Sequence, residues 1–83
     1  MNVKLTYEDD SARNMRKWEK ALFANIECWC DPVESYKAIL RVQKKAAEFK
    51  AKHPEAVGGE LIKTDAYNGQ VILSVLFENP ANF

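Results

Sequence analysis

The sequence predicts an α+β domain in which two antiparallel helices pack on one face of a three-stranded sheet, in the order β-α-α-β-β. Three observations carry this prediction: an alternating stretch at residues 2–7, apolar residues at helical spacing between residues 11 and 52, and an Asn-Gly pair between two β-rich runs. The chain has 83 residues, which is enough for one hydrophobic core, so we expect a single domain, 1–83.

The first predicted element is a strand at residues 2–7. Its side chains alternate between an apolar set, Val3, Leu5 and Tyr7, and a polar set, Asn2, Lys4 and Thr6. A period of two residues is typical of a strand with one buried face.

The second predicted element is a helix from about Ser11 to Cys28–Cys30. Acidic and hydroxyl residues at positions 8–11 suit a helix N-terminus. Steps of three and four then place one apolar stripe on the helix, made of Met15, Trp18, Leu22, Ile26 and Trp29.

The third predicted element is a helix that starts at Asp31-Pro32-Val33-Glu34 and runs to about Lys52. An aspartate followed by proline and then by a glutamate three residues on is the pattern of a capping box with proline at the first helical position. His53-Pro54 ends this helix, with His53 at its C-terminus.

The C-terminal part predicts a β-hairpin. Asn68-Gly69 is the strongest short signal for a two-residue type I′ loop, which pairs Thr64 with Leu73 and Ile62 with Val75 on the face toward the helices. Ile72 and Leu76 make the last strand apolar on both sides, which favours a central position and the strand order 2-3-1. After Glu78 we expect a tail that is loose or packs Phe83 over an edge.

We interpret Cys28 and Cys30 as buried structural residues. On a helix their side chains point about 200° apart, and with His53 as the only histidine the cysteine and histidine ligands for a metal stop at three. The chain contains no phosphate-binding glycine loop, serine elbow or HExxH motif. We therefore predict no enzyme activity, catalytic residue, cofactor or metal, and leave open an enzyme subunit that completes its site in a complex.

The charge is zero overall but divided along the chain. Residues 13–52 hold ten bases and five acids, or 10 − 5 = +5, and the remainder is −5. If the two helices lie antiparallel, their outer sides form a basic band for phosphates. The candidate nucleic-acid-binding residues are Arg13, Arg16, Lys17, Lys20, Lys37, Arg41, Lys44 and Lys45.

The preferred hypothesis uses the face of the sheet that the helices leave open. Four residues are expected to form an apolar patch there, Leu61, Tyr67, Ile72 and Leu76, and a contiguous patch tends to mark an interaction site. We predict a small non-catalytic interaction or regulatory module of the adaptor, inhibitor or accessory type, which binds another protein or a second copy of itself. No membrane or small-molecule partner is indicated, and we expect a cytoplasmic location.

Overall fold

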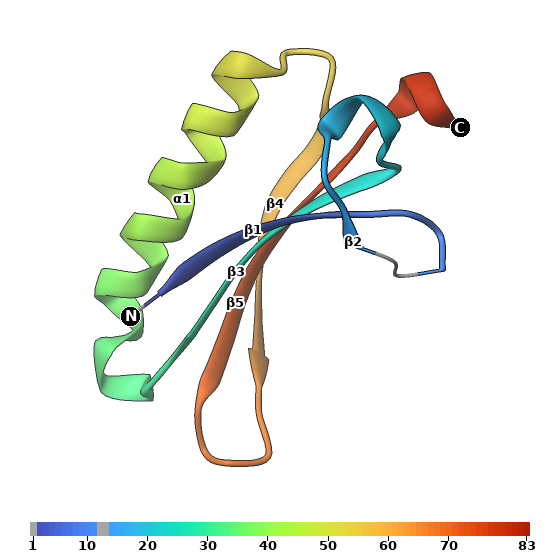
Figure 1. Cartoon of the computed structure of the whole chain (residues 1–83). Helices are drawn as coiled ribbons and strands as arrows, with labels where there is room; N and C mark the ends of the chain where they lie inside the picture. Colours follow the sequence, from blue (N-terminus) through green and yellow to red (C-terminus); the bar gives the residue numbers. More distant parts are fainter. Residues whose placement is uncertain (1, 12–13) are drawn as a thin grey trace.

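The computed structural model describes residues 2–11 and 14–83, apart from the side chain of Asn14, and confirms the α+β class. One α-helix packs on one face of an antiparallel sheet with the strand order β2-β1-β3-β5-β4 (Figure 1). The strands are β1 (Val3–Glu8), β2 (Asn14–Met15), β3 (Phe23–Cys30), β4 (Val57–Asp65) and β5 (Val71–Glu78). The helix is α1 (Ser35–Lys52), and short 3-10 turns are η1 (Trp18–Lys20), η2 (Pro32–Glu34) and η3 (Pro80–Asn82).

The predicted first helix is wrong: its described residues form β2, the turn η1 and, in the second half, the central strand β3. Every residue of β3 pairs with β5, and six of them also pair with β1. Its buried residues are Ala24, Ile26, Cys28 and Cys30, each separated by an outward-facing residue. Trp18 and Ile26 are both buried, as expected. However, Trp18 belongs to the turn η1 and Ile26 to β3, so their spacing does not come from a common helix. Residues 12–13 of the predicted helix lie outside the described residues.

The predicted second helix is confirmed as α1, although it begins at Ser35. Pro32–Glu34 form the turn η2, and Asp31 makes no side-chain capping bond. Ser35 instead donates a 2.8 Å hydrogen bond from Oγ to the carbonyl of Pro32. At the other end the backbone amide of His53 donates to the carbonyl of Phe49, which confirms His53 at the helix C-terminus.

The predicted hairpin is confirmed, but its loop has one residue more than expected. The pairs are Asp65 with Val71, Lys63 with Leu73 and Leu61 with Val75. The loop of residues 67–69 ends with Gly69 at φ +83°, the left-handed conformation typical of a three-residue hairpin loop.

This one-residue difference turns β4 over. The predictions that Ile62 and Thr64 face the helix and that Leu61 faces outward are wrong, since a shift by one residue exchanges the two faces of a strand. The faces of β5 are as predicted. β5 also lies inside the sheet, but between β3 and β4, so the predicted order 2-3-1 is wrong about its second neighbour.

The core lies between α1 and strands β3 and β5. The helix contributes Ala38, Val42 and Phe49, and β5 contributes alternate residues such as Leu73 and Val75. None of the helices in the described part of the chain has the length and apolar content required to cross a lipid bilayer.

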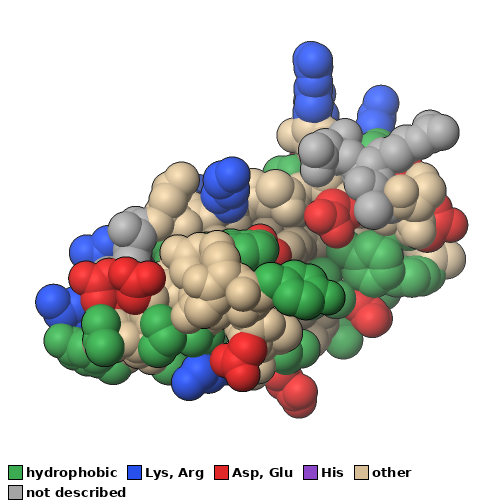
Figure 2. Space-filling view, turned by 90° about the horizontal axis from the view of Figure 1, so that it is seen from below, with side chains coloured by type: hydrophobic (Ala, Val, Ile, Leu, Met, Phe, Trp, Pro, Cys, Tyr) green, Lys and Arg blue, Asp and Glu red, His purple; other side chains and the backbone are tan. Residues whose placement is uncertain are grey.

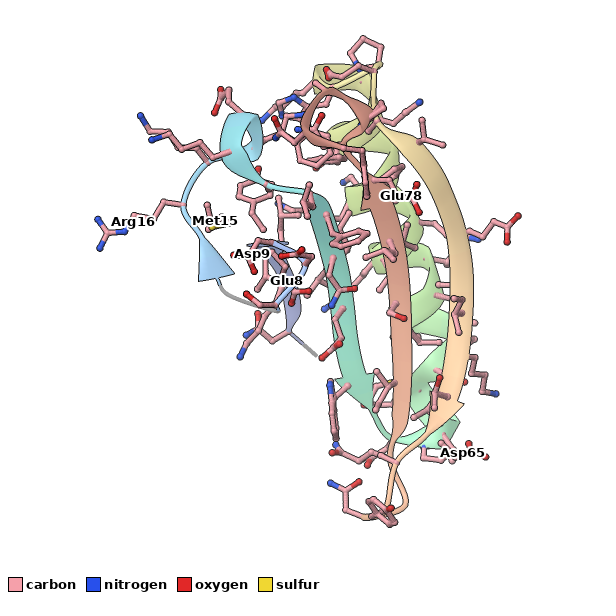
Figure 3. All side chains as sticks on the ribbon, turned by 90° about the vertical axis from the view of Figure 1, so that its right-hand side faces the viewer. Glu8, Asp9, Met15, Arg16, Asp65 and Glu78 are labelled. Carbon is pink, nitrogen blue, oxygen red and sulfur yellow. The ribbon has the colours of Figure 1, made fainter. Side chains whose placement is uncertain are left out.

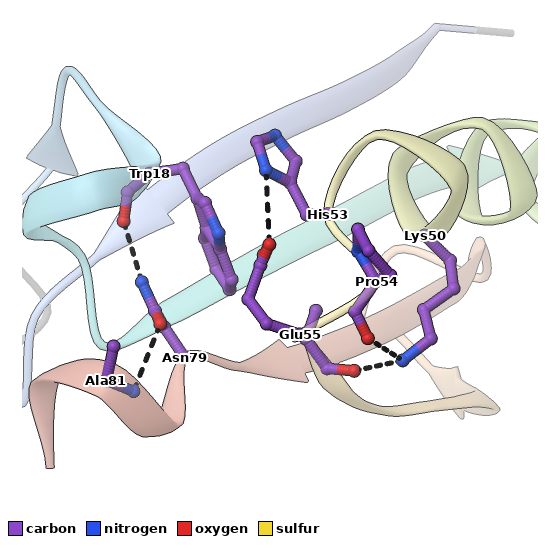
Figure 4. A network of polar contacts seen from close by, with 8 residues as sticks. Trp18, Lys50, His53, Pro54, Glu55, Asn79 and Ala81 are labelled. Carbon is purple, nitrogen blue, oxygen red and sulfur yellow. Dashed lines mark hydrogen bonds and ion pairs between the residues drawn. The ribbon is translucent and has the colours of Figure 1, made fainter.

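The C-terminal tail is held against the body of the protein. Asn79 is buried; its Nδ2 donates a 2.9 Å hydrogen bond to the carbonyl of Trp18, and its Oδ1 accepts from the amide of Ala81 (Figure 4). The Phe83 ring meets the Phe23 ring edge-on with centroids 5.7 Å apart, so of the two expected arrangements the packed one is found.

Candidate functional site: the outer face of the sheet

The face of the sheet opposite α1 carries alternate residues of four strands. We call it the outer sheet face, and Figure 3 views it with α1 behind the sheet. Across β1, β3, β5 and β4 it consists of Lys4, Thr6, Glu8, Phe23, Asn25, Glu27, Trp29, Ile72, Ser74, Leu76, Glu78, Val57, Ile62 and Thr64. No described segment packs over its centre, and only Phe23 is covered by the tail through Phe83.

Four large apolar side chains lie on the outer sheet face. Trp29 lies opposite Ile72 at the hairpin end of the face; Leu76 lies beyond Ser74 on β5, and Ile62 lies opposite Ser74 on β4. The exposed fractions are 46% for Trp29, 42% for Leu76 and 55% for Ile62, which are high for such large side chains. The four side chains therefore form an apolar group across three adjacent strands.

Polar contacts fix Trp29 on this face. Its indole Nε1 donates a 2.6 Å hydrogen bond to Oε1 of Glu27, and Asn25 donates from Nδ2 to Oε2 of the same carboxylate. The indole is therefore already oriented, so binding a partner costs less side-chain entropy than it does for a freely rotating residue.

Acidic residues also lie on the outer sheet face. Glu8 and Glu78 flank Phe23 at one end of the face, and Glu27 faces Lys4 across β1 and β3. The formal charge of the outer sheet face is one base minus three acids, or 1 − 3 = −2. Figure 3 shows Glu8 and Glu78 on the side of the sheet that faces away from α1.

The structure brings together two of the four predicted partner-binding residues. Ile72 and Leu76 lie on the outer sheet face as expected. Leu61 instead packs against the core on the helix side, and Tyr67 is fully exposed at the tip of the hairpin. In the view from below, hydrophobic side chains reach the surface at separate places among charged ones (Figure 2), so this side offers no comparable apolar face.

Sequence reasoning missed Trp29 and Ile62. The helical spacing of Trp29 predicts a place in a helix core. The alternation of apolar and polar residues in Ala24-Asn25-Ile26-Glu27-Cys28 predicts a strand instead, and on that strand Trp29 faces outward. Ile62 was missed because the hairpin loop is one residue longer than expected.

The predicted basic band across two helices does not form, because only one of the two helices exists. Lys37, Arg41, Lys44 and Lys45 are exposed on α1. Arg16, Lys17 and Lys20 are exposed in residues 16–20, around η1, and Arg13 lies outside the described residues.

The two cysteines are free thiols and are buried on the same face of β3. Burial raises the pKa of the Cys30 thiol, and the neighbouring Cys28 thiol raises it further, so this group stays protonated at neutral pH. Among the described residues no three histidine, cysteine, aspartate or glutamate side chains are grouped to hold a metal ion.

Comparisons with models of protein families, with curated proteins and with solved structures found no match for this chain.

Proposed function

We propose that this protein is a non-catalytic interaction module that binds another protein, or a second copy of itself, through the outer sheet face. The observation that supports the proposal most directly is the oriented, exposed Trp29 opposite Ile72, with Leu76 and Ile62 on the same uncovered face of the sheet. Tryptophan at the centre of a patch is over-represented among the residues that dominate binding energy. An adaptor, inhibitor or accessory role fits this arrangement, and two free thiols are compatible with a reducing, cytoplasmic compartment.

The size of the face predicts a modest affinity. Four strands at about 4.8 Å spacing and eight residues at about 3.4 Å rise span roughly 500 Å². Stable complexes bury about 800 Å² on each partner, and smaller contacts are usually transient. We therefore expect a dissociation constant in the micromolar range.

The first test compares two substitutions of the same kind. Leu76→Asp places a carboxylate at the centre of the outer sheet face, whereas Leu40→Asp does the same at an exposed site on α1, where the leucine is 66% exposed. Sedimentation velocity over a concentration series measures self-association. If the protein self-associates through this face, Leu76→Asp abolishes the dimer and Leu40→Asp leaves it unchanged.

The second test addresses a different protein as partner. A photo-crosslinking amino acid at Ser74, on the outer sheet face, is compared in cells with the same amino acid at Lys44, on α1. We expect a discrete adduct from position 74 that Leu76→Asp removes. A monomer at all concentrations together with no adduct specific to position 74 overturns the proposal.

Nucleic-acid binding is the second candidate. It is supported by the seven described residues of the predicted basic set, all of which are exposed and none of which forms an ion pair with a described carboxylate. Phosphate binding by such cations weakens steeply with salt. Filter binding of labelled oligonucleotides over a salt series tests it, and absence of binding at low salt removes it.

A further inference from the structure

A groove on the helix side of the sheet separates the C-terminal end of α1 from residues 16–20. Its larger hollow has a volume of about 540 Å³ and includes Tyr7, Arg16, Lys17, Lys20 and His53 in its lining. A smaller hollow of about 80 Å³ is lined partly by Lys45, Lys52 and again Tyr7 and His53. Because Tyr7 and His53 line both hollows, we treat them as one site and call it the His53 groove.

The floor of the His53 groove is built from packed rings. Trp18 meets Phe49 edge-on with centroids 5.1 Å apart, and the His53 ring lies 4.8 Å from Phe49 and 5.5 Å from Trp18. The side chain of Asn79 donates a hydrogen bond to the backbone carbonyl of Trp18 (Figure 4). These contacts join Trp18 in the turn η1 to Phe49 and His53 at the end of α1, so they connect the two sides of the groove.

The rim of the His53 groove is basic. Arg16, Lys17 and Lys20 line one wall, and Lys45 and Lys52 line the other. Glu19 and Glu48 also line the hollows, so the formal charge is 5 − 2 = +3. None of the five cations forms an ion pair with a carboxylate among the described residues; Glu55 lies beside His53, with its Oε1 3.9 Å from Nδ1.

Cations without carboxylate partners beside half-buried rings are the chemistry of sites for single-stranded nucleic acid. The cations attract phosphates, and aromatic rings contact the flat faces of bases. Burial raises the pKa of the Tyr7 hydroxyl, and the charge of Glu19 raises it further. The hydroxyl therefore stays protonated and can donate a hydrogen bond to a phosphate oxygen.

We propose that the His53 groove binds a phosphate-bearing nucleotide unit, presented either by a single-stranded nucleic acid or by a free nucleotide. The rim lysines and the Tyr7 hydroxyl contact the phosphate, while the His53 ring contacts the base. The larger hollow of about 540 Å³ falls within the usual range for small-ligand sites, about 300–1,000 Å³. This inference rests on the second candidate function and is independent of the outer sheet face.

Two neighbouring lysines on α1 provide a matched test. Lys45 lines the His53 groove and Lys44 does not, yet both are exposed and both substitutions to glutamate change the net charge equally. We expect Lys45→Glu to weaken the binding of a labelled oligothymidylate about tenfold in fluorescence anisotropy, and Lys44→Glu to change it by less than about twofold. Equal losses of affinity in both variants place binding on the open side of α1. That result overturns the proposal of a His53 groove site but leaves nucleic-acid binding as a candidate function.

Trp18 supplies a second, local measurement. In a Trp29→Phe protein it is the only tryptophan, and it lines the larger hollow, so a ligand in the groove changes its fluorescence. Oligothymidylate, uridine monophosphate and inorganic phosphate are titrated separately. A change with the oligomer alone identifies a single strand, and a change with the monophosphate as well identifies a free nucleotide. No saturable change with the oligomer or the monophosphate at low salt overturns the proposal.

Discussion

Gly59→Ala is expected to destabilise the protein because two separate constraints meet at this residue. Gly59 has φ +98°, a conformation that residues with a side chain adopt only with strain. A Cβ at this position lies 2.8 Å from Cε1 and 3.1 Å from Cζ of Phe77. The ring of Phe77 is buried and packs against Phe49 with centroids 4.9 Å apart, so it has little room to move away.

The expected magnitude follows from adding the two constraints. Placing a side chain at positive φ costs about 1–2 kcal/mol. Forcing an extra carbon into a packed core costs about 1–3 kcal/mol more. Against this, alanine restricts the unfolded chain and returns about 0.4–1 kcal/mol. Gly59→Ala is therefore expected to lower the free energy of unfolding by about 1–4.6 kcal/mol.

Gly69→Ala is the control, because it carries the backbone constraint alone. Gly69 has φ +83°, and no atom lies within 4 Å of a Cβ built there. In urea unfolding, the loss in free energy of unfolding should be smaller for Gly69→Ala than for Gly59→Ala. The difference between the two losses should be about 1–3 kcal/mol, the cost of the extra carbon in the core. Phe77→Leu removes the ring atoms in contact, so combining it with Gly59→Ala should cost less than the sum of the single changes. Equal losses at Gly59 and Gly69, or strict additivity with Phe77→Leu, refute the steric argument.

Three further predictions concern buried polar groups and thiols. Asn79→Ala removes the partner of the Trp18 carbonyl and should lower the free energy of unfolding by about 1–3 kcal/mol. Asn82→Ala, which removes hydrogen bonds from an exposed residue to the carbonyls of Glu19 and Ala21, should cost less in the same urea titration. Both cysteines should resist a thiol reagent in the native protein and react once it unfolds. Because the folded state raises the pKa of Cys30, the folded chain keeps a proton that the unfolded chain loses; stability should fall as pH rises above the ordinary value of 9.0, and less steeply in Cys30→Ala.

The parts of the fold predicted correctly are those with a strong local signal. The strand at residues 2–7, the helix that ends at His53 and the C-terminal hairpin each combine a periodic pattern with a turn or terminus signal. These signals depend on neighbouring residues and need no knowledge of which segments pair in space. The location of the helix start was less accurate because Pro32 begins a 3-10 turn rather than the α-helix.

The wrong first helix shows where local signals fail. Trp18, Leu22 and Ile26 are spaced for a helix, while Ala24, Ile26 and Cys28 are spaced for a strand, and Ile26 belongs to both patterns. Pairing with β1 on one side and β5 on the other decides in favour of the strand. That pairing joins residues far apart in the chain, so a short window of sequence does not contain it.

The candidate site depended on the same choice. On a helix Trp29 joins the core stripe, but on β3 it lies on the outer sheet face, at the end next to the hairpin loop. Ile72 and Leu76 were located correctly because they share one side of β5 with the polar residues Ser74 and Glu78, whereas the other side is wholly apolar.

The outer sheet face and the His53 groove lie on opposite sides of the sheet and differ in charge, −2 against +3. They share no residue, but they share β1, where Tyr7 lines the groove and Glu8 faces outward. If β1 is rigid the sites are independent, so Leu76→Asp should leave oligonucleotide binding unchanged and Lys45→Glu should leave association through the outer face unchanged. If β1 has two arrangements, each ligand must alter the affinity of the other by the same factor, because binding free energies are reciprocal. Measuring both factors therefore distinguishes a rigid scaffold with two surfaces, where both factors equal one, from a coupled pair, where both differ from one by the same amount.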